Sequence, residues 1–257
     1  MFFNDAAWSK KAWFQKKPFV LGTFVQISDP TVVEILAGAG FDFVLVDCEH
    51  APLSAESVKG LMIASSATGI VPIVRVEQNN ASLVMAPLDS GAVGVQIPHI
   101  RTAEDAQNAV TFAKYHPLGE RGVNPHVRGT RYNPEDFQAY IRWSNENTLV
   151  VVQVEGAEGV DHIDEILEIK GLDVIFLGPY DLSQSIGVPG EVDHPKVVDQ
   201  MKSVILKAKR KGMAIGTFVD DAETAEPWIN LGIQYLVIGY DTRMLFQGAK
   251  ATISVLK

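Results

Sequence analysis

The sequence lacks the features that mark secreted or membrane proteins. Its 257 residues include one cysteine, Cys48, so no intrachain disulfide can form, which fits a reducing compartment. No segment reaches the roughly 18 consecutive apolar residues of a transmembrane helix. The first residues also lack the basic and apolar regions of a signal peptide. We therefore expect a cytoplasmic protein with a short amphipathic helix near its N-terminus.

Positive charge is scarce, because 22 lysines and arginines face 31 aspartates and glutamates and give a formal net charge of −9. An acidic surface repels phosphate backbones and anionic lipids, so nucleic acids and membranes are poor partners. A small anionic substrate remains compatible, because a local arginine or metal ion can reverse the field inside a pocket.

Several catalytic and cofactor motifs are missing as well. The sequence has no cysteine pair, no HExxH, no GxGxxG and no Walker-type loop. Zinc hydrolase, dinucleotide and P-loop chemistry are therefore not indicated.

What the sequence does contain is a repeated pattern of short apolar runs, each followed by a turn and a helix-like segment. Such continuous runs are typical of parallel strands that are covered on both faces. Eight of these units predict a TIM (β/α)₈ barrel that forms a single domain over residues 1–257. The expected strands are residues 20–27, 43–47, 71–76, 94–98, 149–154, 173–177, 213–219 and 235–239, and the expected helices include residues 30–39, 55–67, 102–115, 159–168, 195–211 and 221–231.

Functional residues of such a barrel lie at the carboxyl ends of its strands. The second expected strand ends in VDCEH, which contains Asp47, Glu49 and His50. His50 is the best candidate for a general base, because imidazole titrates near neutral pH. The structural alternative is that Asp47 caps the following turn and that His50 is an ordinary surface histidine.

Arg75 interrupts the third apolar run, IVRV. A buried guanidinium must find an anion, because an unpaired buried charge is costly. Arg75 could bind a substrate carboxylate or a carbonyl oxygen. It could also form a structural salt bridge with Asp47, Glu49 or Asp89, and both roles can hold together.

The fifth and sixth expected strands carry the acidic residues that favour a metal site. Gln153 and Glu155 are two positions apart and so face the same side of a strand, while Asp181 follows the next strand. Two such carboxylates suit a hard cation such as Mg²⁺ or Mn²⁺, although they could instead pair with Arg75 and cap a turn. No lysine interrupts the eight runs, so imine catalysis is disfavoured and metal-assisted stabilisation of an enolate is favoured.

At these residues the sequence resembles the HpcH/HpaI aldolases, which are metal-dependent (class II) pyruvate aldolases on a barrel of the phosphoenolpyruvate-binding type. The resemblance extends over nearly the whole chain, from LGTFVQ to VIGYDTRML. It rests on the motifs GFDFVLVDCEHAP, VPIVRV, GAVGVQIPHI, GERGV, VQVEG and VIFLGPYDLS, which occur in this order.

The resemblance implies roles for individual residues. It assigns Glu155 and Asp181 as ligands of a divalent cation, with Co²⁺ possible beside Mg²⁺ and Mn²⁺, and His50 as the general acid or base. Gln153 and Arg75 are implied to contact pyruvate or its enolate, and Asp47 and Asp89 to support the histidine. Substrate binding is implied for Pro179, Tyr180 and Phe218.

The resemblance also implies a homo-oligomer, commonly a hexamer or trimer of dimers whose subunits exchange the last helix, here residues 242–256. The chain departs from the family pattern at Tyr180 and Phe218, where smaller residues are more usual, and at Cys48, where glycine is frequent. The two added aromatic residues would reshape the pocket for an aldehyde, so the pyruvate half of the reaction is the better founded.

We therefore expect an aldehyde-lyase that cleaves a 4-hydroxy-2-keto acid to pyruvate and an aldehyde through a metal-stabilised enolate. One alternative is decarboxylation of oxaloacetate at the same site, and another is a citrate-lyase-like reaction on an acyl-CoA. A barrel that binds ligands without catalysis would be a third.

The long loop of residues 116–133 is open to two interpretations, since Arg121, His126 and Arg128 could bind a second carboxylate or form structural salt bridges.

Overall fold

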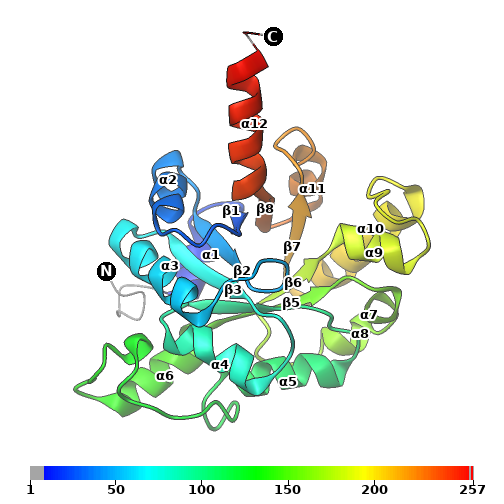
Figure 1. Cartoon of the computed structure of the whole chain (residues 1–257). Coiled ribbons are helices and arrows are strands. Elements are labelled where there is room, and N and C mark those ends of the chain that lie inside the picture. Colours follow the sequence, from blue (N-terminus) through cyan, green and yellow to red (C-terminus); the bar gives the residue numbers. More distant parts are fainter. Residues whose placement is uncertain (1–8, 255, 257) are drawn as a thin grey trace.

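The computed structural model describes residues 9–254 and 256. Its eight strands are all parallel and pair in sequence order around a closed barrel, with β8 returning to β1 (Figure 1). This confirms the predicted barrel and all eight predicted strands. The strands are β1 (Val20–Val25), β2 (Phe43–Asp47), β3 (Val71–Arg75), β4 (Gly94–Ile97), β5 (Leu149–Val154), β6 (Val174–Leu177), β7 (Ala214–Val219) and β8 (Tyr235–Tyr240).

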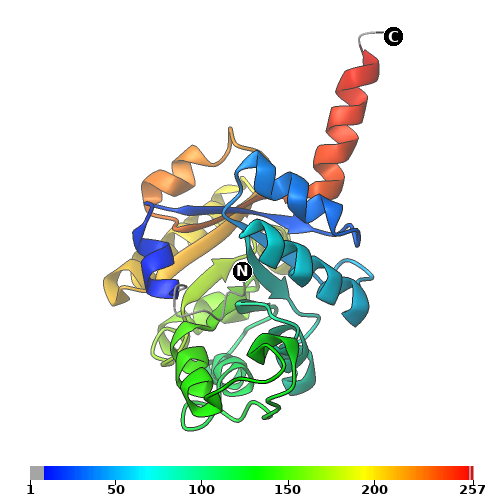
Figure 2. The same ribbon diagram turned by 90° about the vertical axis from the view of Figure 1, so that its left-hand side faces the viewer.

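Helices follow the strands and cover most of the outside of the barrel (Figures 1 and 2). They are α1 (Lys10–Gln15), α2 (Thr31–Ala39), α3 (Ala55–Thr68), α4 (Ala81–Asp89), α5 (Ala103–Ala113), α6 (Phe137–Asn147), α7 (Ala157–Asp161), α8 (Ile163–Ile166), α9 (Pro179–Ser185), α10 (Pro195–Lys211), α11 (Glu226–Leu231) and α12 (Asp241–Ser254).

The helices differ most from the prediction in two places. The helix predicted over residues 159–168 is broken at His162, whose φ of −90° and ψ of 9° end α7 before α8 begins. The helix predicted over residues 221–231 begins only at Glu226. Before it, the carboxylate of Asp221 accepts a hydrogen bond from the backbone N–H of Thr224 at 3.1 Å, and this side-chain bond competes with helix formation.

Two apolar cores hold the barrel together, one between the strands and helices and one inside the barrel. Inside, the rings of Phe43 and Tyr235 stack at 4.4 Å. Trp13 of α1 packs edge-on against Phe43 at 5.8 Å. The short N-terminal helix thus closes the end of the barrel at which the strands begin. The first eight residues of the expected amphipathic segment lie outside the described residues.

Helix α12 extends away from the barrel instead of packing along it (Figures 1 and 2). Its side chains Leu245 and Phe246 are 66% and 67% exposed. None of the helices within residues 9–254 combines the length and the apolar character needed to span a bilayer.

Lys114 lies buried between α5 and the start of β5. It is 1% exposed, and its ammonium group donates hydrogen bonds to the carbonyl oxygens of Asn145 at 2.9 Å and Thr148 at 2.6 Å. Burial lowers the pKa of Lys114 to about 7. The charged form is therefore tolerated less well in the folded than in the unfolded chain.

A pH titration of stability tests this assignment. Between pH 7 and pH 10 the unfolded chain holds more protons at Lys114 than the folded chain does. The free energy of unfolding of the wild type should therefore rise with pH relative to Lys114→Met, by at most about 1.4 kcal/mol per pH unit. Urea unfolding at several pH values measures the difference. Lys202→Met, at an exposed lysine on α10, serves as the control, and parallel curves for wild type and Lys114→Met would contradict the assignment.

Candidate active site

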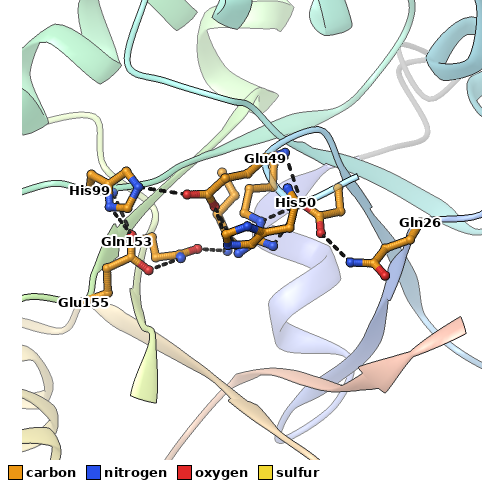
Figure 3. Close-up of polar contacts among 9 residues, drawn as sticks. Gln26, Glu49, His50, His99, Gln153 and Glu155 are labelled. Atoms are coloured by element: carbon orange, nitrogen blue, oxygen red, sulfur yellow. Dashed lines mark hydrogen bonds and ion pairs between the residues drawn. The ribbon is translucent and has the colours of Figure 1, made fainter. Parts of the chain in front are cut away.

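Asp47, the last residue of β2, is fully buried and organises the start of the following loop. Its Oδ1 accepts hydrogen bonds from the backbone N–H groups of Glu49 at 3.1 Å and His50 at 3.2 Å. The same oxygen accepts from Nε of Arg75 at 3.0 Å, and Oδ2 accepts from the amide of Gln26 at 3.0 Å (Figure 3). Asp47 therefore caps the turn, as the structural alternative held, and also neutralises a buried cation.

Arg75 ends β3 directly beside Asp47 in the register of the sheet. It is 4% exposed. Its Nη1 lies 3.1 Å from Oε2 of Glu49, and its guanidinium carbon lies 4.2 Å from the ring centre of Phe24. Its Nη2 lies 2.9 Å from Oδ1 of Asp47 but makes no hydrogen bond. The structural salt bridges are thus present, and Nη2 meets Asp47 as an ion pair without a hydrogen bond.

His99 lies between two carboxylates at the end of β4 (Figure 3). Its Nδ1 is 2.9 Å from Oε1 of Glu155, and its Nε2 is 2.9 Å from Oε1 of Glu49. The hydrogen bond to Glu155 is the main cause that raises the pKa of His99. His99 follows a strand in the motif QIPHI but was not among the predicted site residues. The position after β4 was the signal that could have revealed it.

Glu155 follows β5 and is 4% exposed. It accepts hydrogen bonds from the backbone N–H of His99 at 2.9 Å and from the side-chain amide of Gln153, which in turn accepts one from Gln96 at 2.6 Å. Burial acts to raise the pKa of Glu155, but the hydrogen bonds outweigh it and hold the pKa below its ordinary value. A Cβ on Gly178 would lie 2.7 Å from Oε2 of Glu155, so the neighbouring strand end leaves just enough room for this carboxylate.

Asp181 stands in the first turn of α9, after β6. Its pKa is raised, first by burial and then by the negative charge of Glu155. Among the described residues, Glu49, His99 and Glu155 bring their ligating atoms within 4.8 Å of one another. The strand ends thus gather two acidic side chains and an imidazole at one place, and Asp181 and Glu155 interact through their charges.

His50 lies in the loop after β2 at the edge of this cluster, with its side chain 57% exposed. Its Nε2 is 3.9 Å from Oε2 of Glu49. Asp47 contacts the backbone N–H of His50. The imidazole is therefore free to meet a molecule at the mouth of the barrel.

Asp89 does not join these residues within the chain. It is the last residue of α4, which runs from the carboxyl end of β3 back toward the start of β4. There Oδ1 of Asp89 accepts a hydrogen bond from Arg121 at 2.7 Å. The guanidinium of Arg121 also lies 4.7 Å from the ring centre of Tyr115.

The other two residues of the long loop that were candidates for binding a carboxylate also have structural contacts. Arg128 is buried and donates to the carbonyl oxygen of Ser90 at 3.0 Å and to the hydroxyl of Ser66 at 2.7 Å. His126 is exposed, and its Nδ1 lies 3.1 Å from the carbonyl oxygen of Tyr132. Hydrogen bonds of Arg128 therefore bind the loop to α3 and to the end of α4.

Pro179, Tyr180 and Phe218 lie on the side of the mouth formed by β6 and β7. Pro179 is the buried first residue of α9. The hydroxyl of Tyr180 donates to Oδ2 of Asp220 at 2.6 Å. The rings of Tyr180 and Phe218 are 6.1 Å apart, so these two aromatic side chains form part of one surface next to Asp181.

Comparisons with known proteins agree on the family. The sequence profile of the HpcH/HpaI aldolase/citrate lyase family matches residues 21–248. The 4-hydroxy-2-oxo-heptane-1,7-dioate aldolase of Salmonella typhimurium is 34% identical over 234 residues, which cover 90% of this chain and 88% of that protein.

Solved structures agree as well. The HpcH/HpaI aldolase of Desulfitobacterium hafniense DCB-2 superposes with a TM-score of 0.92 at 32% identity, over 97% of this chain and 96% of that one. The citrate synthase SbnG superposes with a TM-score of 0.87 at 30% identity, over 96% of each chain. The fold, the strand-end residues and these relatives together show that the chain belongs to the HpcH/HpaI aldolase/citrate lyase family.

Proposed function

We propose that the protein is a metal-dependent aldolase that cleaves a 4-hydroxy-2-keto acid to pyruvate and an aldehyde. The observation that carries this proposal is the burial of Arg75 and the contacts of its guanidinium. Its guanidinium is buried and held by Asp47 and Glu49, and its Nη2 is a buried donor without a hydrogen bond. A group fixed in this way can stabilise negative charge as it develops on a substrate oxygen, without first having to reorganise.

The acidic residues fit a divalent cation. Burial and the charge of Glu155 raise the pKa of Asp181, and a cation between the two carboxylates would relieve that repulsion. Glu155 and Asp181 are the ligands we propose for Mg²⁺, Mn²⁺ or Co²⁺, since oxygen ligands suit such ions. The cation would supply positive charge to stabilise the enolate of pyruvate. His99 and Gln153 would keep the carboxylate of Glu155 in place through their hydrogen bonds.

His50 would accept the proton of the 4-hydroxyl group, directly or through a water molecule, as the bond between C3 and C4 breaks. Its exposed imidazole at the mouth supports this role, and Asp47 holds its backbone. Gln153 would orient the keto acid. Because Asp89 is bound to Arg121 in the chain, it could support His50 only from a neighbouring subunit.

The same residues would serve decarboxylation of oxaloacetate, because the loss of CO₂ leaves the same enolate. The likeness to a citrate synthase at 30% identity shows that relatives act on other substrates. Pyruvate release from oxaloacetate, measured beside a panel of 4-hydroxy-2-keto acids, separates the two reactions. Faster turnover of oxaloacetate than of every hydroxy-keto acid would replace the aldolase proposal.

We also propose that the protein is a homo-oligomer, a hexamer or trimer of dimers, in which α12 packs on another copy of the chain. The direction of α12 and the exposure of Leu245 and Phe246 support this.

Removal of the metal tests the proposed ligands. We expect chelator-treated enzyme to lose activity and to regain it with Mg²⁺, Mn²⁺ or Co²⁺. Glu155→Gln should weaken binding of Mn²⁺, measured by equilibrium dialysis, by at least about tenfold, because a charged ligand is lost. Glu158→Gln, at an exposed acid on α7, is the matched control. Unchanged Mn²⁺ binding in Glu155→Gln would exclude Glu155 as a ligand.

Two substitutions test the proposed chemistry. Arg75→Lys and His50→Gln should each lower kcat for aldol cleavage by about 10²–10³, the usual effect of losing one positioned electrostatic or proton-transfer group. His50 is exposed, so its replacement leaves the buried ion pairs intact. His162→Gln, at the end of α7, is the control. Near wild-type kcat in His50→Gln would remove this residue from the mechanism.

The oligomer can be tested by mass. Leu245→Glu combined with Phe246→Glu should reduce the mass measured by size-exclusion chromatography with light scattering, because charge is costly to bury in an apolar contact. Gln247→Glu adds a charge to the same helix and is the control. An unchanged mass in the double variant would show that this face of α12 does not join subunits.

A further inference from the structure

Four aromatic side chains form a continuous wall on one side of the barrel mouth. We define the aromatic wall as Phe24, Tyr180, Phe218 and Tyr240. Phe218 has ring-centre distances of 5.9 Å to Phe24, 6.1 Å to Tyr180 and 5.2 Å to Tyr240. Phe24 and Tyr240 stack at 5.0 Å. The wall is thus one packed surface contributed by β1, β7, β8 and α9.

The aromatic wall borders the proposed reaction site directly. The guanidinium of Arg75 lies 4.2 Å from the ring centre of Phe24, and Tyr180 immediately precedes Asp181 in the chain. The polar groups Glu49, His99 and Glu155 follow β2, β4 and β5, whereas the wall comes from β1, β7, β8 and α9. A keto acid held by these polar groups would therefore direct the rest of the substrate toward the wall.

A positive charge stands beside the wall but is already neutralised. Arg243, in the first turn of α12, donates through Nη1 to Oδ1 of Asp220. The other oxygen of this carboxylate, Oδ2, accepts the hydroxyl of Tyr180 at 2.6 Å. Asp220 thus fixes both the aromatic side chain and the guanidinium. A second carboxylate on a substrate would have to compete with Asp220 for Arg243.

The space next to the wall is also mostly apolar. A cavity of about 60 Å³ adjoins Tyr180 and Phe218. Most of its lining is apolar, and its polar lining residues are the carboxylates Asp193 and Asp220 and the hydroxyl of Thr224. Such a lining favours hydrocarbon groups, since burial of apolar surface is favourable and burial of an unpaired charge is costly.

From this arrangement we propose that the aldehyde partner of pyruvate is uncharged and apolar, and that Asp220 excludes aldehydes that carry a carboxylate by occupying Arg243. This inference rests on the proposed aldolase function. The proposed substrate would differ from the one in the name of the Salmonella relative, a dioate, which is an acid with a carboxylate at each end.

A matched pair of aldehydes tests the inference. Butanal and succinic semialdehyde have the same four-carbon chain, which ends in a methyl group in one and a carboxylate in the other. In aldol addition to pyruvate, the wild type should use butanal with a kcat/KM at least about tenfold higher, because an apolar site rejects an unpaired charge. A preference for succinic semialdehyde would overturn the inference while leaving the aldolase function in place. Lack of turnover with every aldehyde and every hydroxy-keto acid would overturn both.

Variants of Asp220 make the test specific. Asp220→Asn should release Arg243 and shift the ratio of the two kcat/KM values toward succinic semialdehyde by about tenfold, since a free guanidinium binds carboxylate well. Adding Arg243→Met to Asp220→Asn should cancel the shift. Tyr180→Phe keeps the ring and removes only its hydrogen bond to Asp220, so it separates the effect of Tyr180 from that of Arg243.

Asp164→Asn is the matched control, because it breaks the surface ion pair of Asp164 with Lys207, 2.9 Å long, on α8 and α10. The ratio of the two kcat/KM values should not change in this variant. If Asp220→Asn also left the ratio unchanged, with the wild type still active, the proposed role of Asp220 would be wrong.

Discussion

The site depends on the pairing of two buried opposite charges, Asp47 and Arg75. Neither charge would be stable alone at this depth, because water is excluded and the cost of an unpaired ion is high. The register of β2 and β3 sets them side by side. The carboxylate oxygen that accepts from Arg75, Oδ1 of Asp47, also accepts from the backbone N–H groups of Glu49 and His50 and so holds the loop that carries them. The electrostatic requirement of one ion pair thus also fixes the loop of the proposed base.

The barrel could be predicted because its signal is local and repeated. A run of β-branched residues followed by a helical segment indicates one unit, and the number of units indicates closure. The candidate site could be predicted in part for a related reason, since the ends of parallel strands meet at one rim. Gln153 and Glu155 do contact each other there. The departures in helix boundaries arose where a side chain such as Asp221 competes with the backbone for a hydrogen bond.

Other parts of the site depend on contacts between distant residues, which no local pattern encodes. His99 reaches Glu49 and Glu155 because its backbone adopts a φ of 57°, an uncommon conformation for a residue with a side chain. Asp89 appears in the sequence as one more acid near the site. The structure instead places it with Arg121, 32 residues later in the chain. The charge of Asp89 alone could not show whether it lies at the candidate site or beside Arg121.

The side chain of Gln26 connects Asp47 in the candidate site with the base of α12. Its amide donates to Asp47, and its amide oxygen accepts from the hydroxyl of Thr242 at the root of α12 at 3.2 Å. The backbone N–H groups of Gln26 and Ile27 donate to Asp241. One residue is therefore shared between the chemistry of the barrel and the helix that leaves it. A substitution at the base of α12 that displaces Gln26 therefore also removes a hydrogen bond from Asp47 at the candidate site.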